Sequence, residues 1–172
     1  MSCPPPQRKA PFVPTKETVR LMYAIWRGVV LTMALILATP AAVGADVAGD
    51  VEHVLRDIRQ DSPVPKLDYL QRADPINVDC AYYRGRYNGI DVTVETHPNS
   101  DRVASVLLKL HGPDQTPLIL PAVTRVIGPP HASDPKQSSY GWDWPDYRTG
   151  SVHYAGGGEA KEGFTIVSLF YR

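Results

Sequence analysis

An uncharged apolar run, Gly28–Ala45 (GVVLTMALILATPAAVGA), places the strongest constraint on what this chain can fold into. The run follows a basic leader and ends in the small residues Val43-Gly44-Ala45. A positive segment, an apolar core and then small residues are the layout of a secretory signal peptide. We therefore expect cleavage between Ala45 and Asp46, which leaves a periplasmic or secreted body of residues 46–172.

The same run also permits a retained membrane anchor, because 18 uncharged residues reach the lower edge of membrane-spanning length. Pro40 and the Ala-rich and Gly-rich end of the run weaken that alternative. Residues 1–21 are rich in proline, and Met22 is a possible true start of a compact signal peptide. If the run stays uncut, the chain is a membrane-anchored structural protein, and only then is the membrane a partner.

The composition of the body excludes several classes of protein. It holds 13 Lys/Arg against 17 Asp/Glu, a net charge of −4, whereas binding to a phosphate backbone needs clustered basic residues. We therefore expect no nucleic-acid partner. Cys80 is the one cysteine of the body, so no disulfide can form within it, and a small buried hydrophobe is the expected role.

Hydrophobic periodicity predicts two helices in the body. Apolar residues recur at helical spacing in Asp46–Gln60, which ends at a Ser-Pro-Val-Pro stretch. A second helical set runs from Thr116 to Ile127, with Thr116 as the expected N-cap and Pro117 at the first helical position. Pro121 leaves open whether that helix begins at Thr116 or only near Pro121.

Alternating patterns predict the strands. Asn88-Gly89 favours a tight hairpin turn between strands at Asp79–Tyr87 and Ile90–Thr96. A third strand follows near residues 104–110, and two more are expected at Ser151–Tyr154 and Phe164–Tyr171, the last being apolar on both faces and so inside the sheet. The prediction is a single α+β domain with a mostly antiparallel sheet of about five strands and two helices packed on one face.

The order of these elements is similar to that of the outer-membrane assembly lipoproteins and of the secreted β-lactamase-inhibitory proteins. No motif assigns the chain to either family. The lipid-anchor cysteine of the first group is missing after the apolar run.

No residue spacing in the body is typical of catalysis or metal binding. The serines lack a Gly-x-Ser-x-Gly elbow, and no pair of histidines has the spacing of a zinc motif. We therefore predict no catalytic residue, no metal and no cofactor. The alternative is a small envelope hydrolase or glycan-binding enzyme that uses Asp143, Asp146 and one histidine. The histidines are His53, His97, His111, His131 and His153.

The aromatic segment 140–148 (YGWDWPDYR) is the best candidate for a binding surface. Trp, Tyr and Arg most often carry binding energy at protein interfaces. The competing interpretation is that the tryptophans seal the edge of the core. We predict a non-catalytic protein that binds an envelope or extracellular partner protein through loop 129–148, as an inhibitor or an immunity-type protein would. The predicted contact residues are Tyr140, Trp142, Trp144, Asp146, Tyr147 and Arg148.

Overall fold

The structure is a computed structural model that describes residues 46–156 and 162–171. All of them lie in the second of the two units into which the chain divides, Gly44–Arg172. The predictions for the leader and the apolar run fall outside the described residues. Within the described part, no helix is long and apolar enough to cross a membrane.

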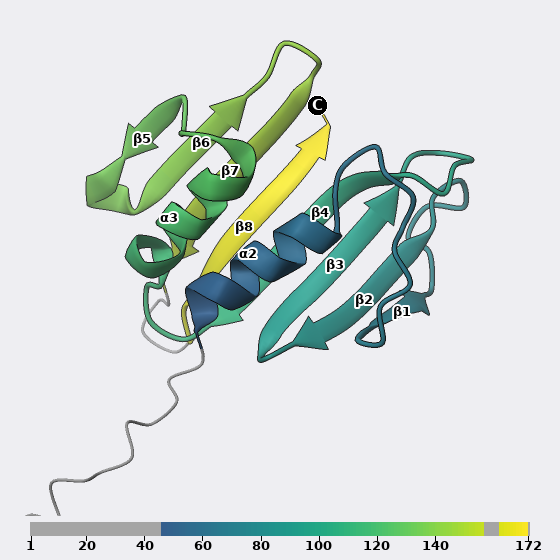
Figure 1. Ribbon diagram of the computed structural model, residues 1–172, viewed down its shortest axis with the longest axis horizontal. Helices are drawn as coiled ribbons and strands as arrows, with labels where there is room; N and C mark the ends of the chain where they lie inside the picture. The colour runs from purple at the N-terminus through teal and green to yellow at the C-terminus, as the bar shows by residue number, and fades with distance from the viewer. Residues whose placement is uncertain (1–45, 157–161, 172) are drawn as a thin grey trace, which may run out of the picture. The chain divides into compact units, whose positions relative to one another are not determined.

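The described residues form two α-helices, a short 3₁₀ helix η1 (Pro135–Gln137) and one antiparallel sheet (Figure 1), which confirms the α+β class. The helices are α2 (Val47–Asp57) and α3 (Thr116–Ile127), and both lie on the same face of the sheet. The sheet has the strand order β1-β2-β3-β4-β8-β7-β6-β5. Its strands are β1 (Leu70–Ala73), β2 (Tyr82–Tyr87), β3 (Ile90–Thr96), β4 (Val103–His111), β5 (Ala132–Asp134), β6 (Ser139–Asp143), β7 (Arg148–Ala155) and β8 (Phe164–Tyr171).

The expectation of about five strands was wrong, because the described residues form a sheet of eight strands. The three strands that the sequence did not predict are β1, β5 and β6. Strands β1 and β5 are the two edges of the sheet, are only 4 and 3 residues long, and pair on one side alone. A short edge strand needs no alternation of apolar residues, so periodicity cannot detect it.

The start of α3 also differs from the prediction. The helix begins at Thr116 with Gln115 as its N-cap, and Thr116 lies inside the first turn. The backbone N–H of Thr116 donates to Asp114 Oδ1 at 2.9 Å, so a neighbouring carboxylate satisfies the helix end in place of the threonine hydroxyl. Pro121 lies within the helix, which continues to Ile127 and ends at Gly128 with φ 91°.

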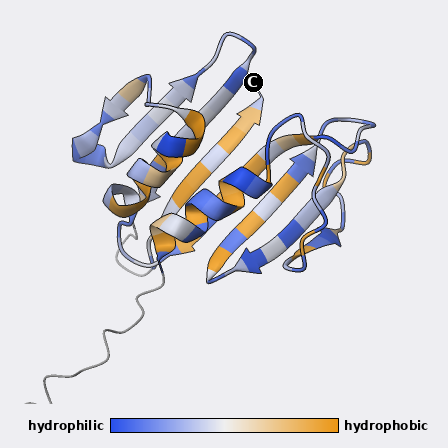
Figure 2. Cartoon of the chain, viewed as in Figure 1, coloured by the Kyte–Doolittle hydropathy of each residue, from blue (hydrophilic) through white to orange (hydrophobic). Residues whose placement is uncertain are grey.

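The hairpin prediction is confirmed. Asn88 (φ 46°) and Gly89 (φ 91°) form the turn that joins β2 to β3, with Tyr87 opposite Ile90. Strand β8 lies in the middle of the sheet between β4 and β7, as its two apolar faces predict. Figure 2 shows hydrophobic residues gathered in the central strands and the helices, while the edge strand β1 is mixed and the edge strand β5 is mostly hydrophilic.

The same order of elements, a helix followed by four antiparallel strands, occurs twice in the described residues: α2 with β1–β4 and α3 with β5–β8. The strand order joins the two halves edge to edge through β4 and β8. Core residues recur at the same spacing in both halves: Val51, Val54, Leu55 and the C-cap residue Ile58 in the first, and Ile119, Ala122, Val123 and Val126 in the second. The two halves therefore bury the same face of each helix against a shared sheet.

The face of the sheet that carries no helix is a mixed surface. Leu107 on β4 is 39% exposed and Phe170 on β8 is 41% exposed, and polar side chains such as Thr93 and Ser168 lie beside Leu107 in the strand register. The helix-bearing face holds the core, including Val94, Val106 and Leu169, which lie in one row across the sheet.

Candidate functional site

Trp142 lies in the hydrophobic core. Only 1% of its surface is exposed, and its indole Nε1–H donates to the carbonyl oxygen of Gly128, just after α3, at 2.9 Å. In the register of β6 and β7 it faces Gly150. The core interpretation therefore holds for Trp142, and its buried ring can support a contact surface but cannot form one.

Tyr140 and Trp144 lie at the border of that core. Both side chains are partly buried and pack against the core cluster. The ring of Trp144 covers Gly150, whose absent Cβ would lie 3.5 Å from Trp144 and 2.9 Å from a methyl group of Leu169. The missing Cβ therefore leaves room for Leu169, and the Trp144 ring lies within van der Waals contact of this position.

The turn between β6 and β7 projects the rest of the predicted contact residues. Tyr147 is 72% exposed, and its backbone is left-handed with φ 65°. A bulky residue seldom adopts this conformation, because its Cβ comes close to the carbonyl oxygen. The turn is held by the backbone N–H of Trp144, which donates to the carbonyl of Arg148 at 3.0 Å. A closed turn therefore presents an aromatic ring to solvent.

Arg148, the last residue of this turn, contacts both Asp146 and the ring of Trp144. Its Nε donates to Asp146 Oδ2 at 2.7 Å, and its guanidinium lies 5.5 Å from the centre of the Trp144 ring. Both contacts fix the long side chain before any partner arrives, which lowers the entropy that binding would cost. A shallow hollow of about 630 Å³ lies beside the turn, lined by Asp143, Trp144, Pro145 and Tyr147. We call residues Trp144–Arg148 the aromatic turn.

The residues of the alternative enzyme hypothesis are only partly brought together. The ring of His131 lies edge-on to Trp144, and its Nδ1 accepts the backbone N–H of Asp143 at 3.0 Å. Asp146 is engaged by Arg148. In residues 46–156 and 162–171, no three side chains of His, Cys, Asp or Glu are grouped so that they could hold a metal ion.

A contact between a serine and a histidine was not predicted from the sequence. On the helix-free face of the sheet, Ser151 Oγ lies 2.8 Å from Ser168 Oγ and 3.3 Å from His153 Nδ1. Ser151 and His153 are two residues apart on β7 and so point to the same face. The Ser151–His153 distance is long for a hydrogen bond that would activate a nucleophile. The register of β7 and β8 places these groups together, and the spacing of a single strand does not reveal Ser168.

Asp61, His97 and Tyr171 form a second polar cluster, where the loop after α2 meets the end of β8. Tyr171 donates its hydroxyl to Asp61, and His97 Nε2 lies 3.1 Å from the other carboxylate oxygen. The hydrogen bond from Tyr171 holds the pKa of Asp61 below its usual value. Burial and the bond to Asp61 raise the pKa of Tyr171 to about 12. Sequence reasoning missed this cluster, because its members are far apart in the chain.

Cys80 is buried and unpaired, as predicted. Burial raises the pKa of its thiol, which keeps the group protonated and unreactive. Cys80 therefore fits a structural role.

No model of a known protein family, no curated protein and no solved structure matches this chain. The geometry of the described residues is therefore the basis for a function.

Proposed function

We propose that this chain is a non-catalytic protein of the cell envelope that binds a partner protein through the aromatic turn, in the manner of an inhibitor or an immunity-type protein. The observation that carries the proposal is Tyr147, which is 72% exposed and held at φ 65°. Strained backbone that presents a large aromatic side chain to solvent is a feature of binding and functional sites.

The neighbours of Tyr147 support the same proposal. Trp144 packs against the core, Arg148 lies over its ring, and Asp146 orients Arg148. Trp, Tyr and Arg are the residue types enriched among residues that dominate binding energy. Trp142 and Tyr140 belong to the packing beneath this surface, so the contact residues within segment 140–148 are Trp144, Asp146, Tyr147 and Arg148.

We place the mature protein in the periplasm or outside the cell, after cleavage between Ala45 and Asp46. The signal-like layout of residues 28–45 supports this placement. Asp46 is the N-cap of α2 and accepts the backbone N–H of Gly49 at 3.0 Å, so cleavage before Asp46 would leave the cap of this helix in the mature protein. The intact mass of the protein recovered from its native compartment tests this. A mass that includes residues 28–45 would favour the anchored structural protein instead.

A glycan-binding site or a small hydrolase is the second candidate. The hollow lined by Asp143, Trp144 and Tyr147 favours it, because sugars stack on aromatic rings beside polar groups. A soluble glycan that quenches tryptophan fluorescence in the wild type, and not in Trp144→Ala, would support this candidate over the first.

Affinity capture from the cell envelope tests the main proposal. We expect Tyr147→Ala to lose the partner that the wild type retains, with an unchanged far-UV circular dichroism spectrum. Lys136→Ala, an exposed change on the nearby 3₁₀ turn, is the control and should retain it. Equal capture by the wild type and Tyr147→Ala would refute the aromatic turn as the contact surface.

A further inference from the structure

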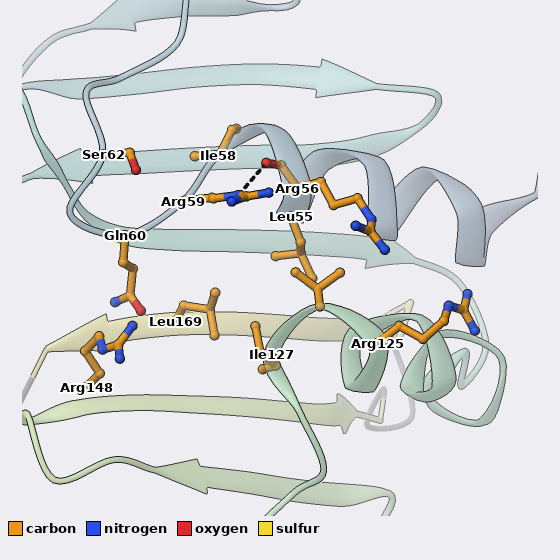
Figure 3. Close-up of a pocket in the computed structure, with 11 residues that line it drawn as sticks. Leu55, Arg56, Ile58, Arg59, Gln60, Ser62, Arg125, Ile127, Arg148 and Leu169 are labelled. Carbon is orange, nitrogen blue, oxygen red and sulfur yellow. Dashed lines mark hydrogen bonds between the residues drawn. The ribbon is translucent and has the colours of Figure 1, made fainter.

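A cleft of about 340 Å³ opens between the C-terminal ends of α2 and α3 (Figure 3). Its apolar wall comes from both helices and from β8. Leu55 and Leu169 are buried in the core, and Ile127 is partly buried against it. Leu55 and Leu169 expose only 2% and 6% of their surface, so the partly buried Val126 and Ile127 supply most of the accessible apolar wall. The volume suits one or two side chains and lies at the lower end of the range for ligand pockets.

Four arginines surround this apolar wall. Arg56 and Arg59 lie at the end of α2, Arg125 lies in the last turn of α3, and Arg148 begins β7. We call these four residues and the apolar wall the arginine cleft. Figure 3 shows the four side chains arranged around Leu169 and Ile127.

The carboxylates nearby neutralise only part of this charge. Glu52 accepts from both Arg56 (2.8 Å) and Arg125 (2.6 Å), and Asp146 pairs with Arg148. Arg59 donates its Nε to the carbonyl of Arg56, and no carboxylate among the described residues lies within ion-pair distance of it. Four guanidinium groups and two paired carboxylates give the cleft a net positive charge, whereas the body as a whole has a net charge of −4. Asp61 lies near enough for Arg148 to lower its pKa slightly, which is a minor cause beside Tyr171.

Helix stability alone does not explain this arrangement. A basic residue near a helix C-terminus interacts favourably with the helix dipole, which accounts for Arg56 and Arg125 individually. It does not account for Arg148, which comes from a strand, nor for the apolar wall beside the charges. A guanidinium binds a carboxylate with two parallel hydrogen bonds, so such a cluster suits acidic groups.

We infer that the arginine cleft binds an acidic segment of the partner protein. One apolar side chain of that segment lies against Ile127, beside the small exposed edges of Leu55 and Leu169. Its flanking carboxylates bind Arg59 and Arg148. This inference rests on the proposed function, because Arg148 belongs to both the aromatic turn and the cleft. The turn supplies the aromatic anchor, and the cleft selects a partner with negative charge beside it.

The test measures fluorescence anisotropy with a labelled peptide that alternates Leu and Glu. We expect saturable binding that weakens as salt is raised. Arg59→Gln should weaken it by about two- to fivefold, the range for one exposed ion pair. Glu52→Gln should strengthen it, because Arg56 and Arg125 lose their neutralising carboxylate. Arg84→Gln removes the same charge from exposed β2, outside the cleft, and should change nothing.

Several results would overturn the inference. One is equal affinity for a peptide with Gln in place of Glu, and another is an equal loss of affinity in Arg84→Gln and Arg59→Gln. A third is complete displacement of the labelled peptide by an aliphatic carboxylate, which would assign the cleft to a small amphiphile. Capture of the native partner separates this failure from failure of the proposed function. If Tyr147→Ala loses the partner while Arg59→Gln and Arg125→Gln keep it, the aromatic turn stands and the acidic segment is wrong.

Discussion

Replacing Trp142 tests whether this residue belongs to the core, because a core residue contributes to the free energy of unfolding and a surface contact residue does not. Truncation to alanine removes a side chain that is 1% exposed and the hydrogen bond from its indole to Gly128. Buried Trp→Ala substitutions cost about 3–5 kcal/mol, so we expect a loss of about 4 kcal/mol. Trp142→Phe keeps a ring but leaves the Gly128 carbonyl without its donor, and should cost about 2 kcal/mol.

Urea unfolding followed by far-UV circular dichroism measures these losses. With a slope of about 2 kcal/mol per molar urea, the midpoint should fall by about 2 M for Trp142→Ala and about 1 M for Trp142→Phe. A loss of 4 kcal/mol is a large share of a typical domain stability of about 5–15 kcal/mol. A cost below about 1 kcal/mol, together with loss of partner binding, would refute the core placement of Trp142.

Three further predictions concern stability. The hydroxyl of Tyr69 is buried without a hydrogen-bond partner among the described residues, so Tyr69→Phe should raise the free energy of unfolding by about 1 kcal/mol in urea titrations; a decrease would show that the hydroxyl is satisfied. Gly85→Ala would place a Cβ 1.8 Å from the carbonyl oxygen of Tyr69, so it should detach β1 and lower the free energy of unfolding by more than about 2 kcal/mol. If the variant is as stable as the wild type, the close approach of Gly85 to the Tyr69 backbone is wrong. The pKa of Asp61 is lower in the folded state than in the unfolded state, where it is about 4, so ionised Asp61 stabilises the fold above about pH 4. This contribution is lost as the pH falls through the folded pKa. Asp61→Asn should therefore flatten the dependence of the melting temperature on pH below about pH 4, and an unchanged slope would refute this.

The sequence predicted those elements whose local chemistry decides their conformation. Asn88-Gly89 accepts the positive φ angles of a tight turn, and Val51, Val54, Leu55 and Ile58 can share one face only in a helix. The two apolar faces of β8 likewise predicted a central strand. In each case the pattern within one segment was sufficient.

The edge strands and the cleft could not be predicted in this way. Strand β5 is a three-residue Ala-Ser-Asp segment that is exposed throughout, and its pairing with β6 alone makes it a strand. Arg59, Arg125 and Arg148 come together only because the two helices pack side by side with their C-terminal ends toward the start of β7. Alternation places the Trp142 and Trp144 rings on one side, but they differ in burial. Trp142 is buried and bonded to Gly128 at the end of α3, whereas Trp144 is only partly buried.

The affinity of the captured partner for Tyr147→Gly tests the central claim most directly. Glycine adopts a left-handed backbone without strain, so this variant should be as stable as the wild type or about 0.5 kcal/mol more stable. Because the aromatic ring is lost, we expect the dissociation constant, measured by titration calorimetry, to rise at least about tenfold. An unchanged dissociation constant for Tyr147→Gly, with a large rise for Leu107→Ser on the helix-free face, would contradict the account and place the partner on the open sheet.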